Sequence, residues 1–155
     1  MLSSPFTLRS DADVLETFRK TDQDSVILSR NLRYPLFIKH DHTWTDPSGV
    51  YTYLVYKRQD WETPLGLVFH RNQPGASASP AGMCEWCNSF GTSNEFGLMT
   101  TSLNTKVSSG TWLCLDLACA QKIEEIAGLN SKAKEKRLGK LFQKIGAFYQ
   151  RVRFD

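Results

Sequence analysis

Two close pairs of cysteines constrain the fold of this chain more than any other feature of its sequence. Two residues separate Cys84 from Cys87, and after 26 intervening residues Cys114 and Cys119 follow, with four residues between them. These are the four cysteines of the chain. Two such pairs are typical of a site in which four thiolates hold one zinc ion. Because all four ligands would be cysteines, we expect a closed, structural site.

The two pairs would present their sulfurs in different ways. A two-residue gap lets a tight turn offer both sulfurs to one ion, and Asn88 tolerates the left-handed backbone that such a turn needs. A four-residue gap within one helix would set the sulfurs about 140° apart. We therefore expect Cys114 to end a strand and Cys119 to take the third position of a helix capped by Asp116. Turn, hairpin and helix together predict a treble-clef zinc finger.

The cysteine spacing alone also allows disulfides or a redox-active pair. Disulfides belong to oxidising compartments, and the N-terminus lacks the basic and apolar regions of a secretory signal. A redox-active Cys-x-x-Cys pair stands at the start of a helix after a strand, whereas Cys84 follows a segment rich in Pro, Gly, Ser and Ala. We favour zinc over both.

The length of 155 residues predicts a single α+β domain with an antiparallel sheet. Residues 1–72 would form a front half without cysteine, residues 73–82 a flexible connector, and residues 83–155 the zinc finger with a C-terminal helix. No apolar run reaches the roughly 18 residues of a membrane span. We therefore expect a cytoplasmic protein without a membrane partner.

Local patterns predict the elements of the front half. Ser10 can cap a short helix, and β-branched and aromatic runs at 50–56 and 65–70 predict a β-hairpin. Residues 34–42 predict a further strand, which Pro35 confines to an edge or a strand start.

In the back half, residues 96–103 predict a strand, and residues 111–113 predict the end of a second one. Residues 131–155 predict an amphipathic helix, because their apolar side chains recur at helical spacing. The stripe consists of Leu138, Leu141, Phe142, Ile145, Phe148, Tyr149 and Val152.

Charge is divided unevenly along the chain. Lys and Arg outnumber Asp and Glu by 8 to 2 within residues 131–155, whereas residues 1–130 carry 11 basic against 14 acidic side chains. A basic tail on a mildly acidic body suggests a surface for RNA, the ribosome or an acidic protein. The alternative is a basic helix face that water alone covers.

Other residues with chemical potential favour structural roles. His40, Asp41 and His42 could form a metal or acid–base site, but we expect an exposed polar segment there. Trp86 and Trp112 flank the zinc ligands, and we favour core positions for both over partner contacts. The sequence holds no phosphate-binding loop, nucleophile elbow or zinc-protease motif. We expect neither enzymatic activity nor a small-molecule substrate.

The back half resembles a known family. The blocks Gly82-Met-Cys-Glu-Trp-Cys87 and Gly110-Thr-Trp-Leu-Cys-Leu-Asp-Leu-Ala-Cys119, followed by a basic helix, are similar to the C-terminal treble-clef zinc finger of the elongation factor G-binding proteins. That family includes the fusidic-acid-resistance proteins. The resemblance implies that Cys84, Cys87, Cys114 and Cys119 bind zinc.

The resemblance also implies a partner, translational elongation factor G, whose release from the ribosome such a protein would modulate. It places the partner surface on the zinc-bearing part, which makes Lys106, Trp112, Lys140 and Lys144 the candidate contacts. The rival hypothesis is a ribosome- or RNA-binding zinc module that uses the basic tail. Resistance proteins carry an additional helical N-terminal domain, and the residues before Val50 leave no room for a full one.

Overall fold

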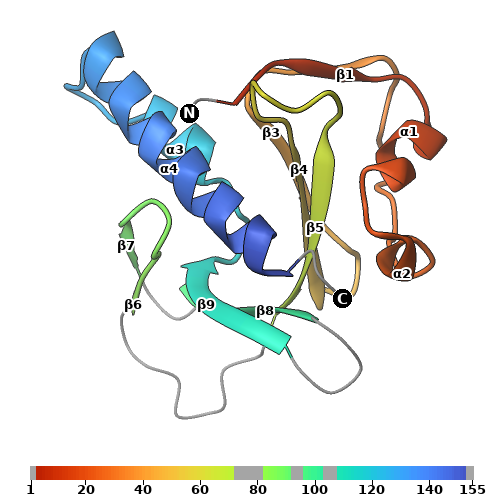
Figure 1. The fold of residues 1–155 in the computed structure, drawn as a ribbon. Coiled ribbons are helices and arrows are strands. Elements are labelled where there is room, and N and C mark those ends of the chain that lie inside the picture. The colour runs from red at the N-terminus through yellow and green to blue at the C-terminus, as the bar shows by residue number, and fades with distance from the viewer. Residues whose placement is uncertain (1–2, 72–81, 92–95, 103–107, 153–155) are drawn as a thin grey trace.

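A five-stranded antiparallel sheet in the order β3-β4-β5-β8-β9 is the centre of the computed structural model, which describes residues 3–71, 82–91, 96–102 and 108–152 (Figure 1). Two pairs of short strands, β1-β2 and β6-β7, form separate small sheets. In chain order the elements are β1 (Phe6–Leu8), α1 (Asp11–Glu16), α2 (Lys20–Gln23), β2 (Leu36–Ile38), β3 (Asp41–Thr45), β4 (Tyr51–Tyr56), β5 (Leu65–Arg71), β6 (Gly82–Met83), β7 (Phe90–Gly91), β8 (Phe96–Ser102), β9 (Ser108–Cys114), α3 (Cys119–Glu124) and α4 (Ser131–Val152).

The predicted hairpin at 50–56 and 65–70 is confirmed as β4 and β5, which pair from Tyr51 opposite His70 to Tyr56 opposite Leu65. The strand predicted at 34–42 is instead two strands in different sheets. β2 follows Pro35 and pairs with β1, whereas β3 pairs with β4.

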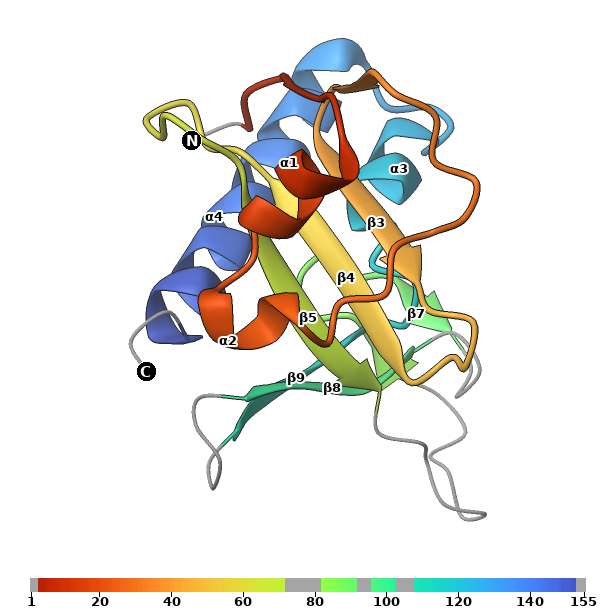
Figure 2. The ribbon, with the colours of Figure 1, turned by 90° about the vertical axis from the view of Figure 1, so that its right-hand side faces the viewer.

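The β8-β9 hairpin turns away from the other three strands of the sheet. Among the described residues, β5 pairs with β8 through two residue pairs, His70 opposite Thr100 and Arg71 opposite Met99. The hairpin therefore crosses the lower end of β3, β4 and β5 (Figures 1 and 2). This bend carries the end of β9 toward the cysteines of the β6-β7 turn.

Helices cover the two faces of β3, β4 and β5 unequally. The short helices α1 and α2 lie on one face, and the long helix α4 lies on the other (Figures 1 and 2). Because side chains alternate along a strand, β4 supplies both layers: Tyr53 and Val55 belong to the α1 side, and Leu54 and Tyr56 to the α4 side.

The layer on the α1 side contains a small aromatic cluster. The Ser10 hydroxyl accepts a hydrogen bond from the backbone N–H of Asp13 at 3.2 Å, which confirms it as the cap of α1. Phe18 follows this helix and meets Trp44 and Tyr53 edge to face, each at 6.0 Å between ring centroids. A Cβ on Gly66 would come within 2.7 Å of the Phe18 ring, so β5 needs glycine at this point.

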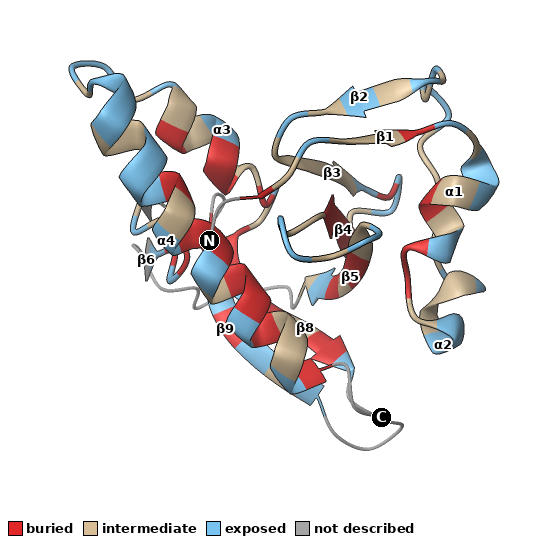
Figure 3. Cartoon of the chain, turned by 45° about the horizontal axis from the view of Figure 1, so that its top comes forward, coloured by how far each residue is buried: buried red, intermediate tan, exposed pale blue. Residues whose placement is uncertain are grey.

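Helix α4 confirms the predicted apolar stripe. Its core-facing side is buried and its other side is exposed (Figure 3). Six members of the stripe are fully buried in the larger core cluster, and Tyr149 packs against it. Residues 153–155 of the predicted helix lie outside the described residues. No helix in the described part of the chain is long and apolar enough to cross a membrane.

Candidate metal centre

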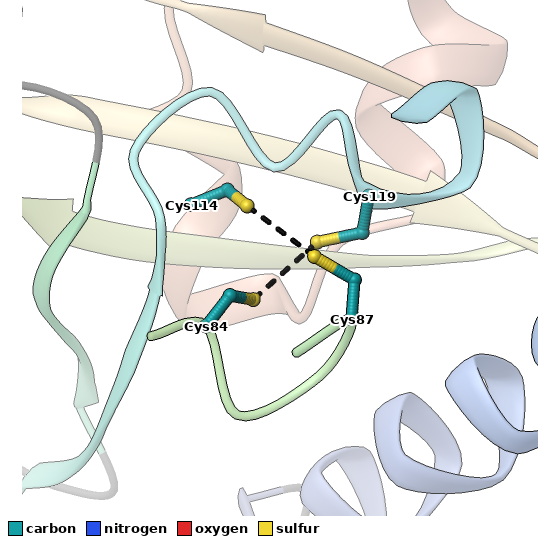
Figure 4. Close-up of side chains that lie close together, drawn as sticks. All are labelled: Cys84, Cys87, Cys114 and Cys119. Atoms are coloured by element: carbon teal, nitrogen blue, oxygen red, sulfur yellow. Dashed lines mark hydrogen bonds between the residues drawn. The ribbon is translucent and has the colours of Figure 1, made fainter. Parts of the chain in front are cut away.

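The four cysteine side chains converge on one point between three segments of the back half (Figure 4). Cys84 and Cys87 come from the turn between β6 and β7, Cys114 ends β9, and Cys119 begins α3. The sulfurs of Cys84 and Cys119 are 3.7 Å apart, and those of Cys87 and Cys114 are 3.6 Å apart. All four sulfurs lie within 4.8 Å of one another.

This donor set fits a zinc ion. Four thiolates at about 2.3 Å from a tetrahedral zinc ion would stand about 3.8 Å from one another. None of the four cysteines is in a disulfide, so that alternative is not realised. Cys84, Cys114 and Cys119 are buried and Cys87 is partly buried. Four thiolates would fill the tetrahedral coordination of the ion and leave no open position for a water or a substrate. Such an ion would tie the three segments together rather than act as a Lewis acid.

Backbone hydrogen bonds hold the first pair in the predicted tight turn. The N–H of Asn88 donates to the carbonyl of Cys84 at 2.8 Å, and the N–H of Cys84 donates to the carbonyl of Ser89 at 3.0 Å. Asn88 has a φ of 62°, which confirms the left-handed residue expected there.

The second pair is held differently from our prediction. Asp116 does not cap the helix: Ala118 is the N-cap, and the Asp116 carboxylate accepts from the Ala118 N–H at 3.0 Å inside the preceding turn. Leu117 has a φ of 53°, and its N–H donates to the carbonyl of Cys114 at 3.0 Å. This left-handed residue delays the helix, so Cys119 is its first residue rather than its third. Helix α3 ends at Glu124.

The crowded sulfurs perturb one another strongly. Hydrogen bonds from Cys114 and Cys119 lower the pKa of the Cys84 thiol to about 7, and they hold the pKa of Cys87 far below its ordinary value. The neighbouring sulfurs, that of Cys114 first, together with burial raise the pKa of the Cys119 thiol. Four thiolates so close together repel one another, and a divalent cation would remove that penalty.

Comparison with known proteins identifies the family to which this chain belongs. The sequence model of the FBP C-terminal treble-clef zinc-finger family matches residues 15–153. The chain belongs to this family. The resemblance found in the cysteine blocks is thereby confirmed, and the four clustered cysteines are consistent with one structural zinc ion.

A solved structure has a similar fold. The fusidic acid resistance protein FusC superposes with a TM-score of 0.51 and 19% sequence identity over 92% of this chain. The chain spans about 60% of the length of that protein. No curated protein matches the sequence.

The two tryptophans beside the zinc ligands have different positions. Trp86 is 6% exposed and packs edge to face on Phe69 and Phe148, which confirms the core prediction for this residue. The same prediction is wrong for Trp112, which is 40% exposed on β9. Its cross-strand neighbour Leu98, which the sequence analysis missed, is 38% exposed. Alternation along both strands could have found this pair, had the register been known.

The candidate lysines are not all described. Lys106 lies outside the described residues, as does nearly all of the expected connector at 73–82. Lys140 and Lys144, both on α4, line one cavity of about 430 Å³ next to Cys87. The Lys144 ammonium donates to the carbonyl of Glu85 at 2.9 Å, and the N–H of Glu85 donates to the carbonyl of Trp112 at 2.8 Å. Glu85 therefore connects α4 to β9.

The segment around His40 is not the exposed polar stretch that we expected. Both ring nitrogens of His40 make hydrogen bonds, Nδ1 with the Ser3 hydroxyl at 3.3 Å and Nε2 with the Glu124 carboxylate at 2.9 Å. His40 thus links the segment before β1 to α3. Asp41 has a buried, unpartnered Oδ2 opposite Tyr56, and burial raises its pKa to about 7. The His42 ring lies tilted against Trp44, with 5.1 Å between ring centroids, and burial lowers the pKa of His42. Within the described residues, only the cysteines cluster as metal ligands.

Proposed function

We propose that this chain is a non-enzymatic zinc-finger protein that binds translational elongation factor G and modulates its release from the ribosome. Membership of the FBP zinc-finger family and a fold similar to that of a fusidic acid resistance protein support this proposal. Such a partner implies a cytoplasmic protein. The closed Cys₄ centre supports a binding role, because the ion would have no free position for a substrate.

The observation that carries the proposal is an exposed apolar pair on the β8-β9 hairpin. Leu98 and Trp112 stand directly opposite each other in the antiparallel register. A Cβ on Gly110 would come within 3.3 Å of the Leu98 side chain, so Leu98 lies against this glycine. Tryptophan is one of the residue types enriched at the anchor positions of protein interfaces. We call Leu98 and Trp112 the hairpin surface.

The zinc centre would hold the hairpin surface in place. Cys114 is two residues from Trp112 on the same strand, and the carbonyl of Trp112 accepts a hydrogen bond from the turn that carries Cys84 and Cys87. Zinc bound to all four cysteines would fix the end of β9 against that turn. The hairpin surface would then meet its partner with little loss of conformational entropy.

A binding protein of this kind needs no chemical step. It shifts the release of elongation factor G if it binds the released state of the factor more tightly than the ribosome-bound state. A tenfold preference corresponds to about 1.4 kcal/mol.

The test is direct binding of the zinc-loaded chain to purified elongation factor G, measured by calorimetry at low and high salt. We expect binding that persists at high salt, because an aromatic anchor is screened less than an ion pair. Trp112→Ala should weaken binding at least about tenfold.

Phe37→Ala is the matched control. Phe37 is also an aromatic residue on a strand, and it is 77% exposed, but it lies on β2 in the front half. Phe37→Ala should leave the affinity for elongation factor G unchanged. Absence of binding by the zinc-loaded wild type, or weakening by Phe37→Ala rather than Trp112→Ala, would contradict the proposal.

A further inference from the structure

A cavity of about 430 Å³ lies between the cysteine turn and helix α4, outside the hairpin surface. Its lining residues are Trp86, Cys87, Asn88, Ile123, Arg137, Lys140 and Lys144. Helix α4 passes on the Cys87 side of the cysteine cluster (Figure 4). Three of the lining side chains are cationic, and none is a carboxylate.

The three cations come from one face of α4. Arg137, Lys140 and Lys144 are spaced by three and four residues, so they follow one another along the helix. Arg137 and Lys140 are exposed and make no hydrogen bond or ion pair with any residue that the structure describes. Lys144 is fixed by its bond to the Glu85 carbonyl. Like charges gathered in a concave site raise the local concentration of anions.

The zinc centre does not account for these charges. Four thiolates and one Zn²⁺ carry a net charge of −2, and of the four ligands only Cys87 lines the cavity. Three cations exceed what the whole centre would need. The cavity therefore stays electropositive when the metal is bound.

We propose that this cavity binds phosphate groups of an RNA strand. The planar guanidinium of Arg137 can take a phosphate through two parallel hydrogen bonds, and the two ammonium groups add point charges beside it. The amide of Asn88 supplies a further neutral donor at the wall.

The rest of α4 favours a nucleic acid over an acidic protein. Its 22 residues carry seven Lys or Arg and a single acidic residue, Glu135, over a length of about 33 Å. A nucleic acid strand has one phosphate at every nucleotide, whereas an acidic peptide matches such a row only where its acidic residues happen to fall. The three cations of the cavity would then contact successive phosphates, and the flanking cations guide the strand.

The test is fluorescence anisotropy of a labelled single-stranded RNA of about 12 nucleotides, titrated with the zinc-loaded chain at several salt concentrations. If three phosphates are neutralised, the logarithm of the affinity should fall with the logarithm of the salt concentration with a slope of about −2. Arg137→Gln with Lys140→Gln should weaken binding at least about tenfold and bring the slope to about −0.7.

Lys132→Gln with Lys136→Gln is the matched control, because it removes the same charge from exposed positions of α4 that do not line the cavity. It should weaken binding much less. Equal losses in both double variants would show diffuse attraction to the helix and overturn the proposal. So would absence of RNA binding at low salt, or equal affinity for a poly-glutamate peptide of the same charge.

A second measurement on the wild type does not depend on the variants folding or keeping zinc. Bound RNA should protect Lys140 and Lys144 from chemical acetylation more than Lys132 and Lys136, and uniform protection would contradict the cavity site. The proposal is independent of elongation factor G. Trp112→Ala should weaken binding to elongation factor G and leave the affinity for RNA unchanged. Failure of either proposal can therefore be told from failure of the other.

Discussion

The two faces of the central sheet are stabilised in different ways. The α1 side has a small core that contains edge-to-face aromatic contacts and is covered by the short, capped helix α1. Its buried residues are Leu8, Val14, Phe18, Tyr53 and Val55. On the α4 side, a larger cluster joins the sheet to the long helix and includes three of the four cysteines. β4 contributes alternate residues to both.

This difference shows which part of the fold depends on the zinc ion. The α1 side is held by apolar and aromatic packing between α1, β1 and β4, and its cluster contains no cysteine. On the α4 side, short segments meet at the cysteines: a two-residue strand, the end of β9 and a six-residue helix. Segments this short are marginal alone, and the zinc ion would tie them to one another in addition to the core that they share with α4. The hairpin surface lies on this metal-dependent side.

Loss of the metal should have the largest effect on stability. It should destabilise the α4 side of the sheet more than the α1 side. Cys114→Ser, or removal of zinc by a chelator, should reduce the free energy of unfolding by on the order of 5 kcal/mol. Amide hydrogens of α3 and β9 should exchange much faster, while those of β4 and β5 change less. Hydrogen exchange followed by mass spectrometry measures this, and equal loss of protection in all strands would break the comparison.

The reverse perturbation is Phe18→Ala on the α1 side. Phe18 is buried against Trp44 and Tyr53, so the substitution leaves a cavity and should cost about 3 to 4 kcal/mol. Zinc content should stay at one ion per chain, because none of the ligands contacts this cluster. Denaturant unfolding and metal analysis of the same sample provide the check. A variant that also loses zinc would show that the two faces are coupled.

Asp41 should make stability depend on pH from the α4 side of the sheet. Its pKa is about 7 in the folded chain, against an ordinary value of 3.8, because burial disfavours the carboxylate. The protonated form thus stabilises the fold: this contribution is full below about pH 3.8 and is lost as the pH rises through 7.

Asp41→Asn should remove that loss and raise the free energy of unfolding at pH 8 by about 2 kcal/mol, with little change at pH 4. The measurement is the difference between the two unfolding curves across this range, since the titration of His42 is common to both chains. A difference that does not vary with pH would refute the assignment.

The smallest effect on stability should come from the hairpin surface. Trp112→Ala removes an exposed side chain and should change the free energy of unfolding by less than about 0.5 kcal/mol. Trp86→Ala is the contrast, because this buried ring packs on Phe69 and Phe148 and its loss should cost about 3 kcal/mol. Thermal unfolding of both variants decides whether the Trp112 side chain contributes to packing or is free for a partner.

Features that depend on local sequence patterns could be predicted from the sequence. The cysteine spacing indicated the metal centre, the apolar repeat indicated α4, and Ser10 indicated the start of α1. Each of these depends on residues within a few turns of the chain, or on a ligand chemistry that few other arrangements satisfy.

Features that depend on distant segments could not be predicted in the same way. The left-handed Leu117, which shifts the start of α3, follows from the path that Cys119 needs to reach the other sulfurs. The burial of Asp41 depends on which face of β3 is covered. The exposure of Trp112 depends on which side of the hairpin receives the core, and alternation alone does not choose a side.

Hydrogen exchange of the zinc-loaded chain, alone and with purified elongation factor G, tests the central claim most directly, that the metal-dependent side carries the partner surface. We predict slower exchange in β8 and β9 on addition of the factor, with β1 and β2 unchanged. Protection confined to β1 and β2, where Phe37 is exposed, or no protection at saturating factor, would contradict the claim.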